Sequence, residues 1–526
     1  MAFTFQINTD IEFIHDENLL QKAEANKPLI RTEQIRPSRI VDLIHDENRL
    51  NGVSVKESKK NLTELESYSL KRDDKLILDF GNHWVGHFEI NIDRTGSPMD
   101  APLYLRIKFA ELPAELAAES KEYDGWLSRS WIQEEFIHLD TLPAKLTLPR
   151  RYSFRYVELK VIDTSPKWKV VFSNPVVTAE TSADNSSFSP LSLQDDELQK
   201  IYDVGIKTLA DCMQDVFEDG PKRDRRLWLG DLRLQALADY ASFDNIALVK
   251  RCLYLFAGMT TTEGKISANV FVSPKNIPDD TFLFEYSLFF VSVLYDLYQV
   301  HPDIILLKDL YPTAKKQIDI SLRMFDENGK LIPDENYPVF VDWSNEFNKD
   351  TAGQAEMIYV LKQFMLLAET MGDPDINFYR EKLDLICRYA KEKLYCSDHK
   401  LFVTGNNEFN IASQVWMVLA GVMTPEENKE IMQTAIQKMF PVKGIATPYM
   451  YHHIVEALFE AGLKDEAISL MKNYWGKMIA LGADTFWEAF DPEQPDYSPY
   501  GSPIVNSYCH AWSCTPVYLI KKYLTE

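Results

Sequence analysis

The sequence predicts a mainly α protein in which an antiparallel β-sandwich of the jelly-roll kind precedes an (α/α)6 toroid, a ring of six helical hairpins. Two observations support this fold class. Residues 71–187 contain short runs in which apolar and polar residues alternate, a pattern typical of half-buried strands. Residues 188–526 contain twelve helical patterns in succession. Pro, Gly and Asp residues separate these patterns, as expected for helices joined as hairpins.

Residues 1–70 are mixed in character and rich in charge, so we expect an N-terminal arm with some strand. Strands of the β-sandwich domain, residues 71–187, are predicted from runs of β-branched and aromatic residues. These runs lie at Leu76–Gly81, His87–Asp93, Leu103–Phe109, Trp131–Ile137, Leu146–Leu148, Tyr152–Val161 and Lys167–Val177. Turn residues such as Arg94–Pro98 separate them, which favours antiparallel pairing. The polar stretch Thr181–Ser187 marks the domain boundary.

The barrel domain is expected over residues 188–526, because its helical patterns are each about three to five turns long. They begin near Asp195, Leu232, Asn245, Phe282, Asp303, Thr351, Asp375, Asn410, Pro425, Pro448, Leu463 and Asn506. In such a ring the inner helices are apolar all round, and the loops at one end form a funnel. We expect Asp231 to cap the helix that begins near Leu232, because aspartate is a favoured N-cap residue.

Composition and charge exclude several classes of function. The formal net charge is -23 and the sequence pI is about 5.0, which argues against nucleic-acid binding because that requires a positive face. No run approaches the ~18 apolar residues of a membrane span, and the N-terminus lacks signal-peptide features. The six cysteines form no C-x-x-C pair, which indicates a reducing compartment. We therefore expect a cytoplasmic protein without nucleic-acid or membrane partners, and we leave a homodimer open.

One loop of the helical domain, Glu218–Asp231, carries four acids and four bases. Glycoside cleavage requires two carboxyl groups, one to protonate the leaving oxygen and one to activate water or to attack. It also requires polar groups for the sugar hydroxyls and an aromatic face for the ring. The loop offers candidates for all of these at Asp219, Arg223, Asp224, Trp228 and Asp231. The alternative is a solvated cluster of ion pairs, which would contribute little.

A second candidate region lies about 260 residues further on, where Glu488 follows Trp487 in an aromatic setting. An apolar environment raises a carboxyl pKa and suits it for acid–base work, although a structural glutamate remains the alternative. Asp342 and Trp343 add an acid and an aromatic in an interhelical loop, and His510 opens the last helical pattern. Each has a structural alternative as well. No glycine-rich phosphate loop or zinc-ligand spacing is present, so we expect no cofactor and no metal.

At these motifs the sequence resembles the α-L-rhamnosidases of glycoside hydrolase family 78. The resemblance covers most of the chain and consists of several motifs in the family's order. These are Leu78–Gly81 through Glu111, the strand Tyr152–Leu159, the lead-in Phe188-Ser189, the loop Asp219–Asp231, the motif Thr485–Glu488 and the segment Cys509–Trp512.

The resemblance implies a bacterial, exo-acting glycoside hydrolase that releases terminal α-L-rhamnose, or a similar 6-deoxy sugar, with inversion. Family roles place the general acid at Asp224 and the general base at Glu488. Inversion requires these carboxyl groups to lie ~6.5–9.5 Å apart, which leaves room for a water. The resemblance and the local pattern together suggest eight sugar-contacting residues: Asp219, Arg223, Trp228, Asp231, Asp342, Trp343, Trp487 and His510.

Three residues depart from the family pattern. Gly220 stands where the family usually has cysteine, and Asp224 stands where it usually has the longer glutamate. A longer register of the motif would place the acid at Arg225, which cannot donate a proton at working pH. These departures keep two alternatives open: a carbohydrate-binding or sensing homologue without catalysis, and another toroid enzyme such as a glycan phosphorylase. A phosphorylase would need an anion site beside Glu488.

Overall fold

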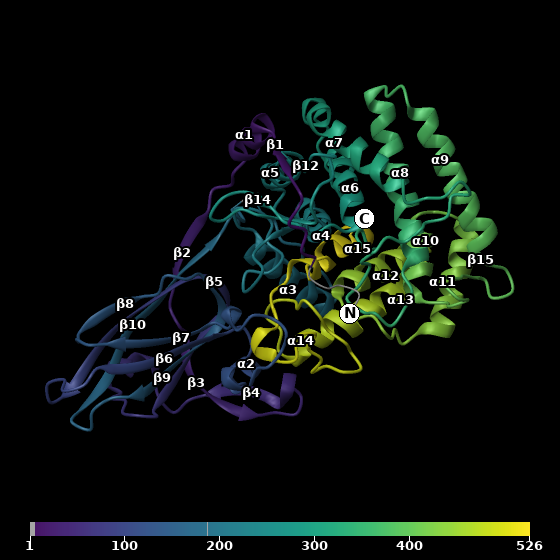
Figure 1. The fold of residues 1–526 in the computed structure, drawn as a ribbon. Coiled ribbons are helices and arrows are strands. Elements are labelled where there is room, and N and C mark those ends of the chain that lie inside the picture. The colour runs from purple at the N-terminus through teal and green to yellow at the C-terminus, as the bar shows by residue number, and fades with distance from the viewer. Residues whose placement is uncertain (1–5, 187, 526) are drawn as a thin grey trace.

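The structure, a computed structural model, describes residues 6–186 and 188–525. An antiparallel sheet domain formed by the N-terminal part of the chain lies beside a larger helical domain (Figure 1). Within the described part of the chain, no helix is long and apolar enough to cross a membrane.

The first described segment packs on the helical domain before the chain enters the sheet. β1 (Phe13–His15) pairs antiparallel with β12 (Met259–Thr261), and α1 (Glu17–Ala25) packs against α5 (Ile246–Ala257), as Figure 1 shows. The guanidinium of Arg251 on α5 donates a 2.9 Å hydrogen bond to the backbone oxygen of Ala23. Residues 6–26 therefore belong spatially to the helices, although the sheet strands follow them directly.

Nine antiparallel strands form the sheet, whose main path has the order β2-β10-β5-β9-β6-β7. Its strands are β2 (Arg31–Ile35), β3 (Arg39–His45), β4 (Val53–Glu57), β5 (Lys75–Gly96), β6 (Leu103–Ala110), β7 (Glu134–Leu139), β8 (Ala144–Thr147), β9 (Tyr152–Asp163) and β10 (Trp168–Thr181). The two strands expected at Leu76–Gly81 and His87–Asp93 are one strand, β5. An irregularity between Asp79 and Trp84 bends β5 without ending it, because a bulge shifts the register while pairing continues.

The two halves of β5 pair with different strands. The first half of β5 pairs with β3 and β9, and its second half pairs with β8 and β10. Phe80 from the first half and Phe88 from the second lie 6.4 Å apart between ring centroids, and Phe88 lies 5.5 Å from Phe109 of β6. Edge-to-face contacts of this kind stabilise an aromatic core.

Twelve helices of the C-terminal domain start close to the predicted positions, with one exception. They are α3 (Asp196–Cys212), α4 (Leu229–Tyr240), α5, α6 (Phe284–Val300), α7 (Ile304–Leu322), α8 (Asp350–Met371), α9 (Ile376–Tyr389), α10 (Ile411–Leu419), α11 (Pro425–Met439), α12 (Pro448–Glu460), α13 (Lys464–Met471) and α15 (Pro516–Leu524), with the short α14 (Lys477–Leu481) after α13. The exception is the last helix, which begins at Pro516 rather than near Asn506. Residues 506–511 instead bond to loops of the cavity described below, for example from the His510 amide to the Phe486 carbonyl.

The inner helices α4, α6, α8, α10 and α12 pack in sequence, and α15 closes the ring by contacting both α12 and α4. The outer helices α3, α5, α7, α9, α11 and α13 each pack on an inner helix or on a segment beside one. The inner helices are buried over most of their length. The predicted (α/α)6 toroid and the antiparallel sheet domain before it are confirmed.

The expected N-cap at Asp231 is wrong. α4 begins at Leu229, so Asp231 lies inside its first turn. The Leu229 amide donates a 3.0 Å hydrogen bond to Ala268, and the preceding β11 (Leu227–Trp228) pairs with β13 (Asn269–Phe271). This short β pairing, which the sequence did not signal, fixes the start of the helix.

Candidate active site

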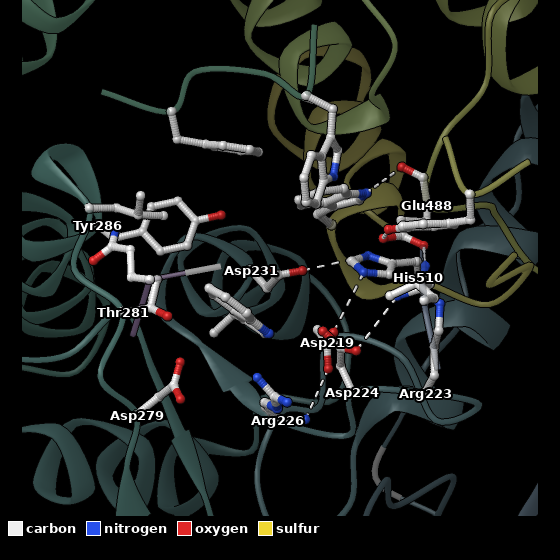
Figure 2. Close-up of a pocket in the computed structure, with 18 of the residues that line it drawn as sticks. Asp219, Arg223, Asp224, Arg226, Asp231, Asp279, Thr281, Tyr286, Glu488 and His510 are labelled. Atoms are coloured by element: carbon white, nitrogen blue, oxygen red, sulfur yellow. Dashed lines mark hydrogen bonds and ion pairs between the residues drawn. The ribbon is translucent and has the colours of Figure 1, made fainter. Parts of the chain in front are cut away.

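A cavity of about 320 Å³ opens where the inner helices begin. This volume lies at the lower end of the range typical of small-molecule sites. Of the ten residues predicted for the site, eight line the cavity: Asp219, Arg223, Asp224, Trp228, Asp231, Trp343, Glu488 and His510. Figure 2 labels all of these except the two tryptophans. The structure therefore brings together side chains from loops more than 250 residues apart in the sequence.

The loop between α3 and α4 is closed at its base and presents Asp224 near its tip. The Asp219 amide donates to the Arg226 carbonyl at 3.0 Å, and the Arg226 amide donates to the Asp219 carboxylate at 2.9 Å. Asp224 and Arg225 both have positive φ, 63° and 54°. Such left-handed backbone is uncommon for residues other than glycine and is typical of tight functional loops.

Arg225 and Asp224 face different surroundings. The Arg225 guanidinium donates to the backbone oxygens of Pro221 at 2.9 Å and of Arg151 at 2.7 Å, and Arg225 does not line the cavity. Asp224 does line it and is 23% exposed. The arginine thus anchors the loop, while the aspartate one residue earlier forms a 3.6 Å ion pair with Arg223 and stays partly exposed toward the cavity.

Gly220 occupies a position with little room for a side chain. A Cβ atom built there would lie 2.9 Å from the Ser507 hydroxyl and 3.4 Å from the Cys509 backbone oxygen. The first of these distances is shorter than real Cβ contacts, so a side chain at this position would displace Ser507. Glycine rather than the family's cysteine at this position is therefore explained by the close approach of two loops.

Glu488 is held by two side chains. It forms an ion pair with Arg223 and accepts a hydrogen bond from the Tyr500 hydroxyl. The Arg223 guanidinium lies 4.1 Å from the Tyr500 ring centroid and donates to the Val505 carbonyl at 2.9 Å. Burial raises the pKa of Glu488, and Arg223 and Tyr500 offset only part of this rise. The result is a buried carboxyl of fixed orientation with an elevated pKa.

His510 lies between two buried aspartates (Figure 2). Its Nε2 is 3.8 Å from Asp219 Oδ2, and its Nδ1 is 3.5 Å from Asp231 Oδ1. Burial, together with the Arg223 charge, keeps the pKa of His510 well below its usual value, so the imidazole is neutral. Asp231 Oδ1 and His510 Nδ1 have no hydrogen-bond partner among the described residues. Buried polar atoms of this kind suit a ligand that carries hydroxyl groups.

The carboxyl groups of the cavity repel one another. Burial raises the pKa of Asp219 well above its usual value, and the charges of Asp224 and Asp231 raise it further. Burial likewise raises the pKa of Asp231, with Glu488 and Asp224 adding to the effect. Carboxyls with shifted pKa values in one cavity are typical of catalytic sites.

Aromatic side chains form much of the remaining wall. Trp228 lies edge-on to Tyr286 at 6.2 Å, and Trp343 lies edge-on to Phe340 at 5.7 Å between ring centroids. Phe340 in turn stacks at 6.3 Å on Trp512. Tyr286, Phe340 and Trp512 were not predicted for the site, although Trp512 stands in the motif that contains His510.

Asp342 and Trp487 do not line the cavity. The Asp342 carboxylate accepts hydrogen bonds from the amides of Ala446 and Thr447 at 3.2 and 3.1 Å and from the Thr447 hydroxyl, so it holds the start of α12. Trp487 is 1% exposed and packs edge-on against Phe490. The contacts of both residues are thus to other parts of the protein and not to the cavity.

The sheet domain also reaches the cavity, which sequence reasoning did not foresee. A loop between β6 and β7 contributes Trp126, Leu127, Ser128 and Trp131 to the lining. The Trp126 indole donates a 3.3 Å hydrogen bond to the Pro499 carbonyl, and its ring lies 5.4 Å from that of Tyr500. The only sequence signal was an aromatic residue directly after the turn Asp124-Gly125.

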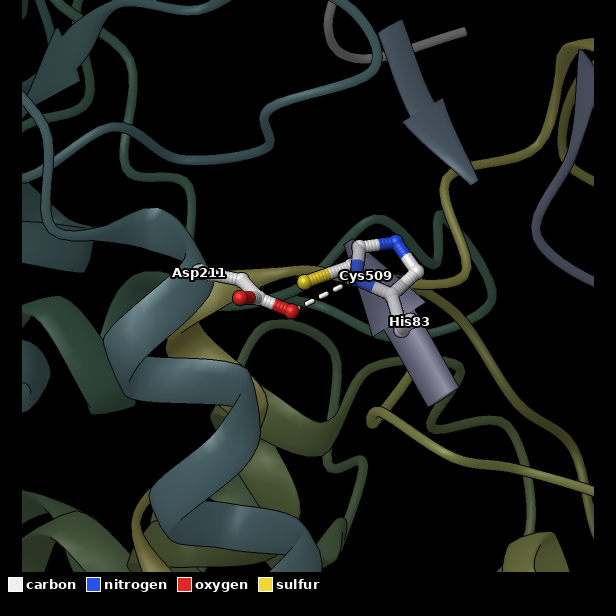
Figure 3. Close-up of side chains that lie close together, drawn as sticks. All are labelled: His83, Asp211 and Cys509. Atoms are coloured by element: carbon white, nitrogen blue, oxygen red, sulfur yellow. Dashed lines mark hydrogen bonds and ion pairs between the residues drawn. The ribbon is translucent and has the colours of Figure 1, made fainter. Parts of the chain in front are cut away.

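His83, Asp211 and Cys509 form a buried group with metal-ligand residue types (Figure 3). His83 Nδ1 lies 2.6 Å from Asp211, and its Nε2 lies 3.1 Å from Glu111. Although burial opposes the charge, Cys509 and the two acids raise the pKa of His83 to about 10. His83 thus links the carboxylates of Asp211 and Glu111 in one buried hydrogen-bonded network.

A ring of six helical hairpins with carboxyls gathered at one mouth of the ring defines a six-hairpin glycosidase. The N-terminal domain model of glycosyl hydrolase family 78 α-rhamnosidases matches residues 37–179. The six-hairpin glycosidase domain model of bacterial α-L-rhamnosidases matches residues 186–524. The chain belongs to the α-L-rhamnosidases of glycoside hydrolase family 78 and is a glycoside hydrolase.

Solved structures agree with this membership. A rhamnosidase from Klebsiella oxytoca with rhamnose bound is 43% identical, with a TM-score of 0.94 over 98% of this chain and 100% of that chain. The rhamnosidase of Bacillus sp. GL1 is 19% identical, with a TM-score of 0.71 over 85% of this chain and 46% of that chain. The Streptomyces avermitilis α-L-rhamnosidase complexed with L-rhamnose is 18% identical, with a TM-score of 0.66 over 94% of this chain and 44% of that chain. The last two show a shared fold alone. No curated protein matches the sequence.

Proposed function

We propose that this glycoside hydrolase releases terminal α-L-rhamnose, or a similar 6-deoxy sugar, from oligosaccharides or glycosides with inversion of configuration. The observation that carries the proposal is the entry of Asp224 and Glu488 into one cavity from loops that are far apart in the sequence. Family membership and the rhamnose bound to the Klebsiella oxytoca relative support the choice of sugar.

In this mechanism Asp224 is the general acid. It is the partly exposed carboxyl at the tip of its loop, so it can exchange its proton with solvent between turnovers. Protonation of the glycosidic oxygen makes the aglycone a better leaving group. The neighbouring Arg225 is held by backbone carbonyls, which supports the register that assigns the acid to Asp224.

Glu488 is the general base in the same mechanism. It removes a proton from a water that attacks the anomeric carbon on the face opposite to the leaving group, and the product is the β-anomer. Burial raises its pKa, and a base with an elevated pKa accepts a proton more readily. Arg223 and Tyr500 fix the direction of the carboxylate.

The remaining predicted residues of the cavity are proposed to bind the sugar. Asp219, Asp231 and neutral His510 offer acceptors and a donor for ring hydroxyls, and the unpartnered Asp231 Oδ1 and His510 Nδ1 support this role. Trp228 and Trp343 offer ring faces for the C–H side of the sugar. The surroundings of Asp342 and Trp487 favour a structural role for these two residues instead.

We further propose a cytoplasmic, bacterial enzyme. The description of the matching six-hairpin domain as bacterial supports the source, and the absence of a C-x-x-C pair supports a reducing compartment. We also propose the division into an arm (1–70), a sheet domain (71–187) and a barrel (188–526), in which the arm supplies β2, β3 and β4 to the sheet. We keep the homodimer as an open expectation.

One observation favours a second candidate, a sugar-binding homologue without catalysis. Asp224 is one methylene shorter than the family's glutamate, so its carboxyl would reach less far toward the glycosidic oxygen. In that case the cavity would hold rhamnose without cleaving an attached aglycone.

The deciding experiment is hydrolysis of a panel of aryl glycosides, including the α-L-rhamnoside, with the released anomer identified by NMR. We expect rhamnoside turnover with β-rhamnose as the first product. Glu488→Gln and Asp224→Asn should each lower kcat by roughly 10²–10⁴-fold. If Glu488→Gln retained turnover, Glu488 would not be the general base. Binding of L-rhamnose without turnover of any substrate, and activity gained in Asp224→Glu, would favour the sugar-binding homologue.

A further inference from the structure

A second cavity lies at the end of the barrel where the inner helices finish. Its volume is about 560 Å³, against about 320 Å³ for the catalytic cavity, and the two cavities have no lining residue in common. All six inner helices, or the turns directly after them, contribute to it: α4 through Leu237, α6 through Asp296, α8 through Tyr359, α10 through Val418, α12 through Glu456 and α15 through Tyr518.

Buried side chains separate the two cavities. Tyr449 and His453 lie one turn apart on α12, and the His453 Nδ1 is 2.9 Å from the Tyr449 carbonyl. Tyr449 faces the catalytic end, where its ring lies 5.7 Å from that of Trp512. His453 faces the other end, where its Nε2 is 3.0 Å from the guanidinium of Arg233. We call the cavity on the Arg233 side the distal cavity.

The distal cavity is electrically balanced. Three cationic side chains line it, namely Arg233, Lys362 and Lys522, and three acidic ones do so too, namely Asp296, Glu456 and Glu460. Most of these charges already have partners. Lys522 contacts Glu456 at 3.4 Å and Glu460 at 3.2 Å, and Lys362 donates to the backbone oxygens of Ala420 and Gly421 at the end of α10.

Arg233 and Asp296 are the two charged side chains of the cavity that remain, and neither has an oppositely charged partner among the described residues. Arg233 is 2% exposed, and its hydrogen-bond partners are the neutral groups of His453 and Tyr359. Its Nε has no hydrogen-bond partner among the described residues, nor has the Oδ1 of Asn428, which also lines the cavity. Within residues 6–186 and 188–525, Asp296 has no ion pair or hydrogen bond, although the charge of Arg233 acts on it. The Arg233 guanidinium, a donor, and the Asp296 carboxylate, an acceptor, thus line the same cavity without a hydrogen bond between them.

This arrangement favours a neutral ligand over a charged one only through its leftover hydrogen-bonding groups. The three cations and three carboxylates largely cancel for either sign of charge, so the cavity offers no net electrostatic attraction to an anion or to a cation. A hydroxyl group serves both leftover charges, because it donates to a carboxylate and accepts from a guanidinium. Tyr295, Tyr359 and Tyr518 add aromatic rings to the wall.

We propose that the distal cavity is a second binding site for a neutral polyhydroxylated ligand, a saccharide of one or two sugar units. Asp296 accepts hydrogen bonds from its hydroxyl groups, and Arg233 donates to them. The ligand is bound without being cleaved, because the site contains no pair of unpaired carboxyls to act as acid and base. This inference stands on the distal cavity alone and does not depend on the sugar that the catalytic cavity cleaves.

The test is equilibrium dialysis of the full chain with labelled L-rhamnose, D-glucose and sucrose, together with crystals soaked in each sugar. At least one sugar should bind in the millimolar range with density against Asp296 and Arg233. Asp296→Ala should weaken this binding tenfold or more and leave kcat/KM for aryl glycosides unchanged. Glu466→Ala removes an exposed carboxylate from α13 and serves as the matched control with unchanged binding.

A folding defect is not expected in Asp296→Ala, because the native carboxylate has no hydrogen-bond partner to lose in the part of the chain that the structure describes. Tyr359→Phe, which removes one hydroxyl, is the second variant and should also weaken binding. The proposal is overturned if the soaked crystals show only water in the distal cavity. It is equally overturned if sugar binding outside the catalytic cavity is unaffected by both variants.

Discussion

Single residues decide how the catalytic cavity responds to pH. Glu488 must be ionised to act as a base, and burial raises its pKa while Arg223 and Tyr500 counteract the rise. The activity carried by this base is therefore present above the folded-state pKa and is lost as the pH falls through it. Because that pKa is raised, we expect the acidic limb of the pH profile to lie above the usual range of a glutamate.

Tyr500→Phe tests this assignment with a minimal change. The variant removes a hydrogen bond that favours the ionised form of Glu488, so the pKa should rise and the acidic limb of kcat/KM should move to higher pH. Arg223→Met removes a cation and should move it further in the same direction. The measurement is the pH profile on an aryl rhamnoside. A limb that stays in place in both variants would show that another group titrates.

Gly220 allows a second prediction at this scale. A Cβ atom at this position would lie 2.9 Å from the Ser507 hydroxyl, and overpacking of this kind costs about 1–3 kcal/mol. We expect Gly220→Ala to lower the free energy of unfolding by an amount in this range, as measured by urea denaturation. Ser507→Ala removes the crowded atom, so the double variant should recover most of the loss. Additive effects of the two changes would contradict the steric explanation.

At the scale of elements, five helix starts of the barrel domain that a side chain caps could be predicted, whereas α1, which Asp16 caps, was not. Asp195, Asn245, Asp303, Asn410 and Thr447 each accept a hydrogen bond from the first turn of their helices, and each stands close to a predicted start. Capping is local chemistry that a sequence displays. The start of α4 and the late start of α15 depend instead on hydrogen bonds to distant loops, which no local pattern contains.

The loop before α8 gives a prediction about one helix start. Asp342 was predicted to bind substrate, but its carboxylate accepts from two amides and a hydroxyl at the start of α12. Loss of a buried charged acceptor costs about 1.5–3 kcal/mol for each such hydrogen bond. We expect Asp342→Ala to lower the thermal midpoint clearly while KM for the rhamnoside changes less than threefold. A large rise in KM without loss of stability would restore the substrate-binding role.

At the scale of the whole molecule, the site depends on contacts between the two domains. Trp126 reaches the cavity from the sheet domain, and Lys222, next to Arg223, is buried against Glu115 of that domain. Sequence motifs identified the acidic loop and Glu488 because each is a compact cluster of unusual residues. They did not identify Trp126, because its role arises from the packing of one domain on the other.

The buried network around His83 makes this domain contact sensitive to pH. His83 on β5 bonds to Asp211 of α3 and to Glu111, and Glu111 in turn accepts from the Tyr508 amide at 2.7 Å. The pKa of His83 is raised from 6.5 to about 10. The folded protein therefore binds a proton more tightly than the unfolded chain does, and stability falls as the pH rises from about 6.5 through about 10.

We expect the thermal midpoint of the whole chain to fall between pH 7 and pH 9.5, and His83→Gln to flatten this slope because the titrating group is gone. Each kcal/mol lost lowers the midpoint by roughly 2–4 °C for large domains, so the slope is measurable by calorimetry. His87→Gln, on the same strand but 43% exposed, is the matched control and should keep the wild-type slope. If His83→Gln also keeps that slope, the alkaline loss of stability arises outside the domain contact.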